Sequence, residues 1–207
     1  MKKILLLTTG GTIASRPTAE GLAPELGGQL LASYLSGFSA NYDLTVRDIL
    51  HLDSSNIQPE EWQLIARHIY SACGDFDGIV VSHGTDTMAY TASVLSFMLP
   101  GLPIPVVLTG AQLPIEHPLT DGVDNLRTAF AMASSGAPGV FLAFNRKVIL
   151  GCRAVKTRTT DFDAFESVNW PLAANVDGKG LQIHREAIPA PAGACACLLY
   201  TSPSPRD

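Results

Sequence analysis

A threonine stands where the chain leaves its first apolar run, in a position that suits a nucleophile. The run Ile4–Leu7 is followed closely by Gly10, Gly11 and Thr12. Two glycines let the backbone turn sharply and approach a ligand, and Thr12 then presents its hydroxyl at the turn. A hydroxyl activated by a nearby base can attack a carbonyl carbon. The same pattern also fits a plain turn with Thr12 as a helix cap, or a phosphate loop of the flavodoxin kind.

A second loop places a hydroxyl beside a carboxylate. The run Gly78–Val81 is followed by His83 and then by Thr85 and Asp86, before a stretch with helical spacing begins. Asp86 could bind a substrate ammonium group, or it could cap the helix that follows. His83 is typical of a structural hydrogen-bonding residue, because no second histidine lies at metal-ligand spacing.

Two further polar segments could supply the remaining groups of such a site. An alcohol nucleophile needs a base, and Lys156 in the hydroxyl-rich segment 155–160 is a candidate, although a solvated surface lysine fits the same pattern. The loop Asp53–Asn56 could hold a carboxylate through its hydroxyl and N–H donors. Alternatively, that loop could cap the helix that follows Pro59.

The elements that would position these loops alternate between strands and helices. Near-continuous apolar runs are typical of parallel strands covered on both faces, and most of them are followed by helical spacing. We expect strands at Ile4–Leu7, Gly78–Val81, Pro105–Leu108 and Gly139–Phe144, with another after a turn in Asn145–Leu150. We expect helices over Glu60–Ala72, Thr87–Met98 and Asp121–Ser134, and a loop over Gly151–Glu166. The sequence therefore predicts an α/β fold, an open and mostly parallel sheet with helices on both faces, whose ligands collect beyond the carboxyl ends of the strands.

The composition narrows the class of protein. The chain has 207 residues, 46% of them hydrophobic, which is enough for one domain with a real core. A net charge of −5 disfavours nucleic acid as a partner, and no apolar run is long enough to span a membrane. The four cysteines show neither disulfide-scaffold nor zinc spacing. These features predict a soluble, cytoplasmic protein without a metal site.

Taken together, the loops resemble the two signature motifs of the L-asparaginase family. The motifs are Thr8–Ser15 and His83–Met88. The likeness continues through residues 21–24, 52–56, 88–92, 109–114 and 163–167, and it covers the chain from Met1 to about Ile188. It is a likeness to the cytoplasmic, type I branch. It implies that residues 1–188 form the flavodoxin-like N-terminal catalytic domain of that family.

The resemblance implies hydrolysis of L-asparagine to L-aspartate and ammonia, without a metal or an organic cofactor. Thr12 would be the nucleophile that forms a covalent acyl ester. Thr85, Asp86 and Lys156 match the family's second catalytic cluster, in which Lys156 acts through Thr85 on proton transfer or on water. Asp86 would also orient the α-ammonium group of the substrate, so Thr85 and Asp86 would serve both binding and catalysis.

Further features of the family can be placed by motif. Asp53, Ser54 and Ser55 match the loop that holds the α-amino and α-carboxylate groups of the substrate. Many members carry a tyrosine in the mobile loop after the first motif, where this sequence has Leu22. The implied partners are a small-molecule substrate and, in the full-length form, further copies of the chain in a dimer or tetramer.

The end of the chain departs from the family pattern. The resemblance implies that family members continue into a second, smaller α/β domain that completes the site of a neighbouring subunit, and we expect that domain to be missing here. Residues 189–207 form a tail rich in Pro and Ser, and from about Cys195 onward this tail resembles neither that domain nor a natural terminus. We expect this tail to be non-native or disordered, the product of a truncated gene model or of read-through.

Other functions fit parts of the same pattern. Glutamine or a carrier-bound amide could replace asparagine, because one methylene changes binding by only about 1–3 kcal/mol. A flavodoxin-like module that binds phosphate or flavin would use the first loop, although the usual nucleotide motifs are absent. An inactive fragment that binds an amino acid is the third alternative.

Overall fold

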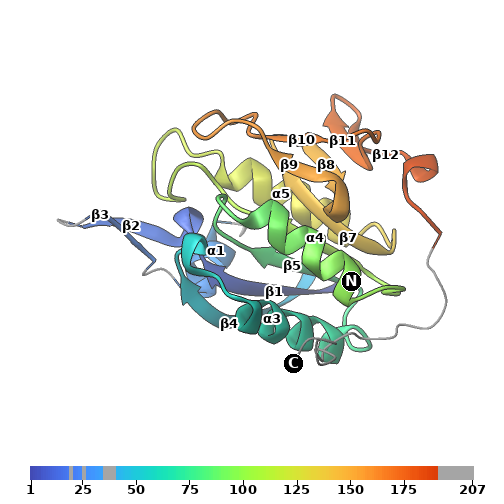
Figure 1. Cartoon of the computed structure of the whole chain (residues 1–207), viewed down its shortest axis with the longest axis horizontal. Helices are drawn as coiled ribbons and strands as arrows, with labels where there is room; N and C mark the ends of the chain where they lie inside the picture. Colours follow the sequence, from blue (N-terminus) through green and yellow to red (C-terminus); the bar gives the residue numbers. More distant parts are fainter. Residues whose placement is uncertain (19–20, 25–26, 35–40, 191–207) are drawn as a thin grey trace, which may run out of the picture.

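The computed structural model describes residues 1–18, 21–24, 27–34 and 41–190 of the chain (Figure 1). Apart from residues 189 and 190, the tail expected at 189–207 therefore lies outside the described residues. Within the described part, no helix has the length and apolar character needed to cross a membrane.

A mixed sheet of eight strands forms the centre of the described structure, in the order β12-β11-β8-β7-β6-β5-β1-β4. Five neighbouring strands run parallel: β4 (Tyr42–Leu52), β1 (Lys2–Gly10), β5 (Gly78–Ser82), β6 (Pro105–Thr109) and β7 (Gly139–Phe144). Three strands continue the sheet in antiparallel pairing: β8 (Lys147–Leu150), β11 (Ala174–Asp177) and β12 (Gly180–Ile183). The predicted open, mostly parallel α/β sheet is confirmed.

Helices cover both faces of this sheet, as expected. The helices α3 (Pro59–Ala72) and α4 (Met88–Met98) pack on one face, and α1 (Gly28–Ser33) and α5 (Gly122–Ala133) pack on the other. Successive side chains of a strand point to opposite faces, so Leu5 and Leu7 join the core under α3 and α4, while Ile4 and Leu6 join the core under α5. A strand buried on both faces must be apolar throughout, which explains the continuous apolar run.

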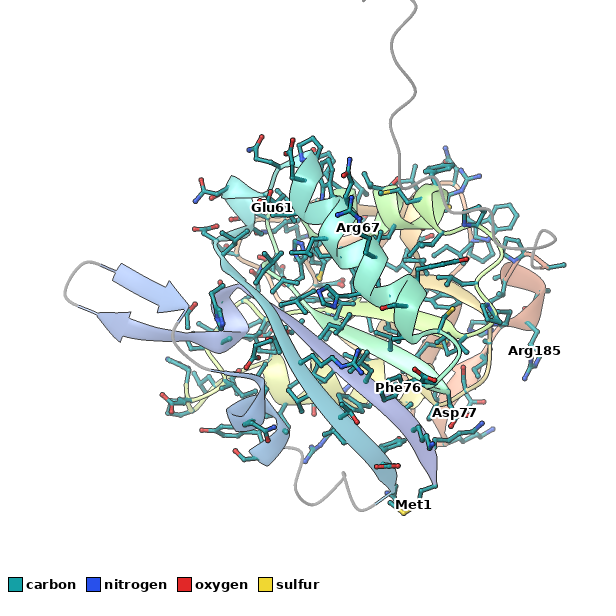
Figure 2. All side chains as sticks on the ribbon, turned by 90° about the horizontal axis from the view of Figure 1, so that it is seen from below. Met1, Glu61, Arg67, Phe76, Asp77 and Arg185 are labelled. Atoms are coloured by element: carbon teal, nitrogen blue, oxygen red, sulfur yellow. The ribbon has the colours of Figure 1, made fainter. Side chains whose placement is uncertain are left out.

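The central strands are held in place at their amino ends as well. Figure 2 shows Glu61 near the start of α3, and Phe76 and Asp77 near the beginning of β1. The Asp77 carboxylate accepts hydrogen bonds from the Lys3 backbone N–H at 2.8 Å and from Lys2 Nζ at 3.2 Å. These contacts hold the pKa of Asp77 below its usual value, the Lys3 bond being the larger cause. They fix the register in which β5 enters the sheet beside β1.

Short elements lead from the strands into the loops that the sequence singles out. The 3-10 turns η1 (Thr12–Ala14) and η2 (Ser54–Asn56) follow β1 and β4, and η4 (Arg185–Ala187) lies near the end of the described chain. A two-stranded hairpin of β2 (Ser15–Thr18) and β3 (Gly21–Pro24) projects from the body of the molecule (Figure 1). Leu22 lies on β3, opposite Pro17.

The loop expected over Gly151–Glu166 is a partial error. This segment contains η3 (Gly151–Arg153) and β9 (Ala154–Lys156), and β9 pairs antiparallel with β10 (Phe165–Ser167). The pair is anchored by Phe165, which is buried with its ring 5.0 Å from that of Phe144. Strands of three residues leave no periodic signal, so tertiary packing defines them.

Candidate active site

A small cavity opens at the carboxyl ends of β1 and β5. Its volume is about 140 Å³, a size that suits a small polar ligand more than a dinucleotide or a flavin. It is lined by Gly11, Thr12, Ser15, Asp53, Ser54, Gly84, Thr85 and Asp86. The fold therefore gathers most of the candidate residues, from three separate loops, around one space.

The first and second loops touch backbone to backbone. A Cβ atom on Gly11 would lie 2.4 Å from the backbone nitrogen of Gly84, and one on Gly84 would lie 2.4 Å from Ser54 Oγ. Gly11 also has φ 84° and ψ 173°, a conformation that is essentially restricted to glycine. Glycine is thus required at both positions for Thr12 and Thr85 to line the same cavity.

Thr12 begins η1 and is not its cap. The N-cap position is Gly11, whose carbonyl accepts a hydrogen bond of 2.9 Å from Ser15 Oγ. The Gly11 N–H donates to the carbonyl of Leu52 at 3.2 Å, so this amide is not available to a ligand. The half-buried Thr12 side chain is left on the cavity wall. The helix-cap alternative for Thr12 is therefore wrong.

Lys156 joins the second loop although it lies about 70 residues further along the chain. Its Nζ donates to Thr85 Oγ1 at 3.0 Å and to Asp86 Oδ1 at 2.7 Å. Only 14% of the Lys156 side chain is exposed, whereas 66% of the Asp86 side chain is open to solvent. The alternative hypothesis, that Lys156 is a solvated surface lysine, is wrong because so little of its side chain is exposed. Asp86 retains an open carboxylate face for a further cation.

Asp86 does not cap the helix that follows it. The N-cap of α4 is Thr87, and its hydroxyl donates to the carbonyl of Ser54 at 2.8 Å instead of to the helix. This bond joins the second loop to the loop Asp53–Asn56. The capping alternative for Asp86 is therefore not realised.

The loop after β4 has its own internal support. The Asp53 carboxylate accepts from the Ser55 backbone N–H at 2.9 Å and from Ser55 Oγ at 2.8 Å, and so caps η2. The helix after Pro59 is capped instead by Gln58 and Glu61, which contradicts the alternative role for this loop. Asp53 and Ser54 line the cavity, whereas the Ser55 hydroxyl is turned toward Asp53.

A chain of hydrogen bonds from α3 through α4 supports the second loop. Trp62 Nε1 donates to Thr91 Oγ1 at 2.9 Å, and Thr91 Oγ1 lies 3.0 Å from Nε2 of His83. His83 Nδ1 lies 2.7 Å from the Gly84 carbonyl, which can only accept, so Nδ1 carries the proton and Nε2 accepts from Thr91. Burial lowers the pKa of His83 to about 4, so its ring is neutral. The expected structural role of His83 agrees with these contacts.

Gln112 is the residue of this site whose role the sequence did not reveal. It lies in the loop after β6, and its Oε1 accepts a hydrogen bond from Thr85 Oγ1 at 3.3 Å. The signal available was its place three residues after the end of β6, since neighbouring parallel strands bring their carboxyl ends together. Elsewhere, no group of three or more His, Cys, Asp or Glu side chains able to hold a metal occurs among the residues that the structure describes.

An open α/β sheet that carries hydroxyls, a carboxylate and a lysine at the carboxyl ends of its strands is typical of an enzyme that acts on a small polar molecule. Residues 3–189 match the family model described as "Asparaginase, N-terminal". The chain belongs to the asparaginase family, and the match covers the N-terminal domain of that family.

Individual relatives agree with this assignment. The chain is similar to L-asparaginase of Thermococcus kodakarensis, with 47% identity over 178 residues, 85% of this chain and 54% of the relative. It is also similar to L-asparaginase 1 of Escherichia coli K12, with 38% identity over 205 residues, 96% of this chain and 60% of the relative. The solved structure of the thermostable L-asparaginase from Thermococcus kodakarensis superposes with a TM-score of 0.85 at 44% identity, covering 93% of this chain and 58% of that one. The chain thus spans 54 to 60% of the length of these relatives.

Proposed function

We propose that this chain carries the nucleophile and the second catalytic cluster of an amidohydrolase that converts L-asparagine to L-aspartate and ammonia. The observation that supports this most is the contact between Gly11 and Gly84, because it puts Thr12 in one cavity with Thr85 and Asp86. The names of the similar proteins support the same substrate.

The proposed reaction has two steps. In the first, Thr12 Oγ forms a bond to the side-chain amide carbon, the C–N bond breaks, and the hydroxyl proton leaves with the nitrogen as ammonia. In the second, water attacks the ester carbon, the bond to Thr12 breaks, and the hydroxyl regains a proton as L-aspartate forms. Splitting the reaction in this way replaces one difficult step by two easier ones.

The second cluster serves proton transfer and substrate orientation in this proposal. Lys156 acts through Thr85 Oγ1, to which it is bonded at 3.0 Å, and the pair assists departure of ammonia or attack of water. The exposed face of the Asp86 carboxylate holds the α-ammonium group of the substrate. Because the Gly11 N–H is bonded to Leu52, donors to the developing oxyanion come from the amides of Thr12 and Thr85.

The remaining assignments complete the substrate site. Asp53 and Ser54 line the cavity and contact the α-amino and α-carboxylate groups, while Ser55 supports Asp53 and acts on the substrate through it. Residues 1–188 form the unit that carries these groups, and the whole protein acts in the cytoplasm as an oligomer. No metal or organic cofactor takes part in the proposed steps.

The test is ammonia release from L-asparagine by the purified chain and two matched threonine variants. Thr12→Ala removes the nucleophile, and we expect kcat to fall on the order of a thousandfold with little change in L-aspartate binding. Thr45→Ala, on β4, is the control and retains wild-type turnover. Turnover by Thr12→Ala at the wild-type rate would contradict the nucleophile assignment. L-aspartate binding without turnover in the wild-type chain would favour an amino-acid-binding fragment, and flavin absorbance would favour a flavodoxin-like module.

A further inference from the structure

We propose that Gln112 is a positioning residue that orients the Thr85 hydroxyl and fixes the loop that follows Lys156. This inference rests on the proposed function for its kinetic consequences, but its structural part stands on contacts of its own. Gln112 lies after β6, and the loop of residues 157–163 follows β9. The residue therefore joins two of the segments that make the second cluster.

The hydrogen bonds of the Gln112 amide determine which way it faces. Its Nε2 donates to the carbonyl of Thr159 at 3.0 Å and to the carbonyl of Asp161 at 2.9 Å. Both N–H groups are thus used, and a flipped amide would set its oxygen against two carbonyl oxygens. Oε1 must therefore face Thr85, where it can only accept.

The orientation of the Thr85 hydroxyl follows from its two neighbours. Gln112 Oε1 can only accept, so the single hydroxyl proton of Thr85 points toward it. The two oxygen atoms, Thr85 Oγ1 and Gln112 Oε1, lie 3.3 Å apart. The Lys156 ammonium can only donate, so it bonds a lone pair of the same oxygen at 3.0 Å. Without the Gln112 oxygen, the hydroxyl could rotate, and the direction of hydrogen bonding from Lys156 through Thr85 would no longer be defined.

The backbone beneath Gln112 is itself held firmly. Its N–H lies 3.0 and 3.1 Å from the two carboxylate oxygens of Asp121, and the N–H of Leu113 also donates to this carboxylate. Asn125 Nδ2 donates both to Asp121 and to the carbonyl of Gly110. The loop after β6 is thus tied to the first turn of α5, which makes Gln112 a rigid support.

Gln112 holds the middle of the loop that follows Lys156. Its far end is held by the ion pair of Lys147 with Asp163, 2.6 Å long, and Arg158 pairs with Glu166 at 2.9 Å. Between these points, Thr159 and Asp161 are exposed, and their carbonyls are bonded to Gln112. Loss of the Gln112 donors should free this stretch and expose the peptide bond after Arg158 to trypsin.

Two substitutions separate the two roles. Gln112→Met keeps the length of the side chain but removes both the acceptor and the donors. Gln112→Glu keeps an acceptor for the Thr85 hydroxyl, yet a carboxylate cannot donate to the two carbonyls. Gln182→Met, on β12, is the matched control, because within the described part of the structure the Gln182 amide reaches only the carbonyl of Gly180, at 3.4 Å.

The experiment measures tryptic cleavage after Arg158 by mass spectrometry, together with hydrolysis of L-asparagine. We expect cleavage faster than that of the wild type in both Gln112 variants, and cleavage at the wild-type rate in the Gln182→Met control. We expect kcat to fall about tenfold or more in Gln112→Met with KM changed less than about threefold, and to fall clearly less in Gln112→Glu. Wild-type cleavage in both variants would overturn the loop-fixing role. Equal loss of kcat in both variants would overturn the orienting role, because loop release alone would then explain it.

The outcomes also separate this inference from the proposed function. If the wild-type chain releases no ammonia, the hydrolytic function fails, whereas the trypsin comparison still decides whether Gln112 fixes the loop. In that case L-aspartate binding, measured by calorimetry, replaces kcat as the second measurement. Weaker binding in Gln112→Met than in Gln112→Glu would support the orientation of Thr85, and equal binding in the two would contradict it.

Discussion

Gly11 and Gly84 meet so closely that a single added methyl group on Gly11 would lie 2.4 Å from the Gly84 nitrogen. This junction joins the loop after β1 to the loop after β5. It also sets the separation between Thr12, on one side, and Thr85, on the other. The proposed chemistry therefore depends on two residues that have no side chain.

We predict that Gly11→Ala destabilises the protein by at least about 3 kcal/mol and abolishes L-aspartate binding. The substitution combines a glycine-only backbone conformation with a clash against the second loop. Chemical denaturation and calorimetry measure the two effects. Gly136→Ala is the control, because Gly136 also has positive φ, 72°, but has open space around its Cβ position. A loss no greater than that of the control would show that the contact between the loops is unimportant.

Lys156→Met should slow turnover by about a hundredfold or more, because it removes the donor to Thr85 and Asp86. The pH dependence of kcat should change as well, since a group in the proton path is lost. Steady-state kinetics across the accessible pH range make the measurement, with Lys179→Met, on an exposed turn, as the control. A pH–rate profile identical to that of the wild type would exclude the proton-transfer role.

His83 should make the protein sensitive to mild acid. Its folded-state pKa is lowered from 6.5 to about 4 by burial, so the unfolded chain binds a proton that the folded chain does not. Its contribution to stability is present above pH 6.5 and is lost as the pH falls toward about 4, at a cost of about 3 kcal/mol. The unfolding free energy, measured across this window, should fall less in His83→Gln.

The two carboxyl groups with a lowered pKa, Asp77 and Asp163, act in a different pH range from His83. Hydrogen bonds from the Lys3 N–H and from Lys147 hold the pKa values of Asp77 and Asp163 below the usual value of a carboxyl group, so the stability that these residues contribute is lost only in stronger acid. His51→Gln, at an exposed position on β4, should retain the wild-type pH dependence. An unfolding free energy of His83→Gln that falls as steeply as that of the wild type would show that His83 is not the sensor.

Thr91→Val should destabilise the protein by about 1–3 kcal/mol, although it preserves the shape of the side chain. It leaves both the Trp62 N–H and the His83 Nε2 without their partner in a buried site. Thr128→Val is the control, because the buried Thr128 hydroxyl donates to the Asp124 carbonyl within its own helix and, among the residues that the structure describes, to no other group. Equal unfolding free energies for the two variants would mean that the chain of hydrogen bonds through Thr91 stabilises the protein no more than the single bond of Thr128 does.

The central part of the fold could be predicted from the sequence because its strands are apolar throughout. Ile4–Leu7 and Gly78–Val81 are buried on both faces, so each gives an unbroken apolar run. β4 was not predicted, because this edge strand is only partly buried and mixes charged with apolar residues. β9 and β10 were missed because elements of three residues are defined by the packing of Phe165 and not by any periodic pattern.

The candidate site was less accessible to sequence reasoning. Its loops could be found at the ends of apolar runs, but the contact of Lys156 with Thr85 joins residues that are 71 positions apart. From the sequence, only the resemblance to a family placed Lys156 and Thr85 in the same cluster. Gln112 was part of a recognised motif but received no role, because its partners Thr159 and Asp161 lie in a loop whose course depends on the whole sheet.

The most direct test of the proposed chemistry is to trap the covalent intermediate. The chain is mixed with L-asparagine, quenched in acid within the first turnover, digested and mapped by mass spectrometry. We predict an aspartyl ester on the peptide that contains Thr12, and its absence in Thr12→Ala. An aspartyl ester on any other residue, or turnover of L-asparagine that persists in Thr12→Ala, would contradict the central claim that Thr12 is the nucleophile.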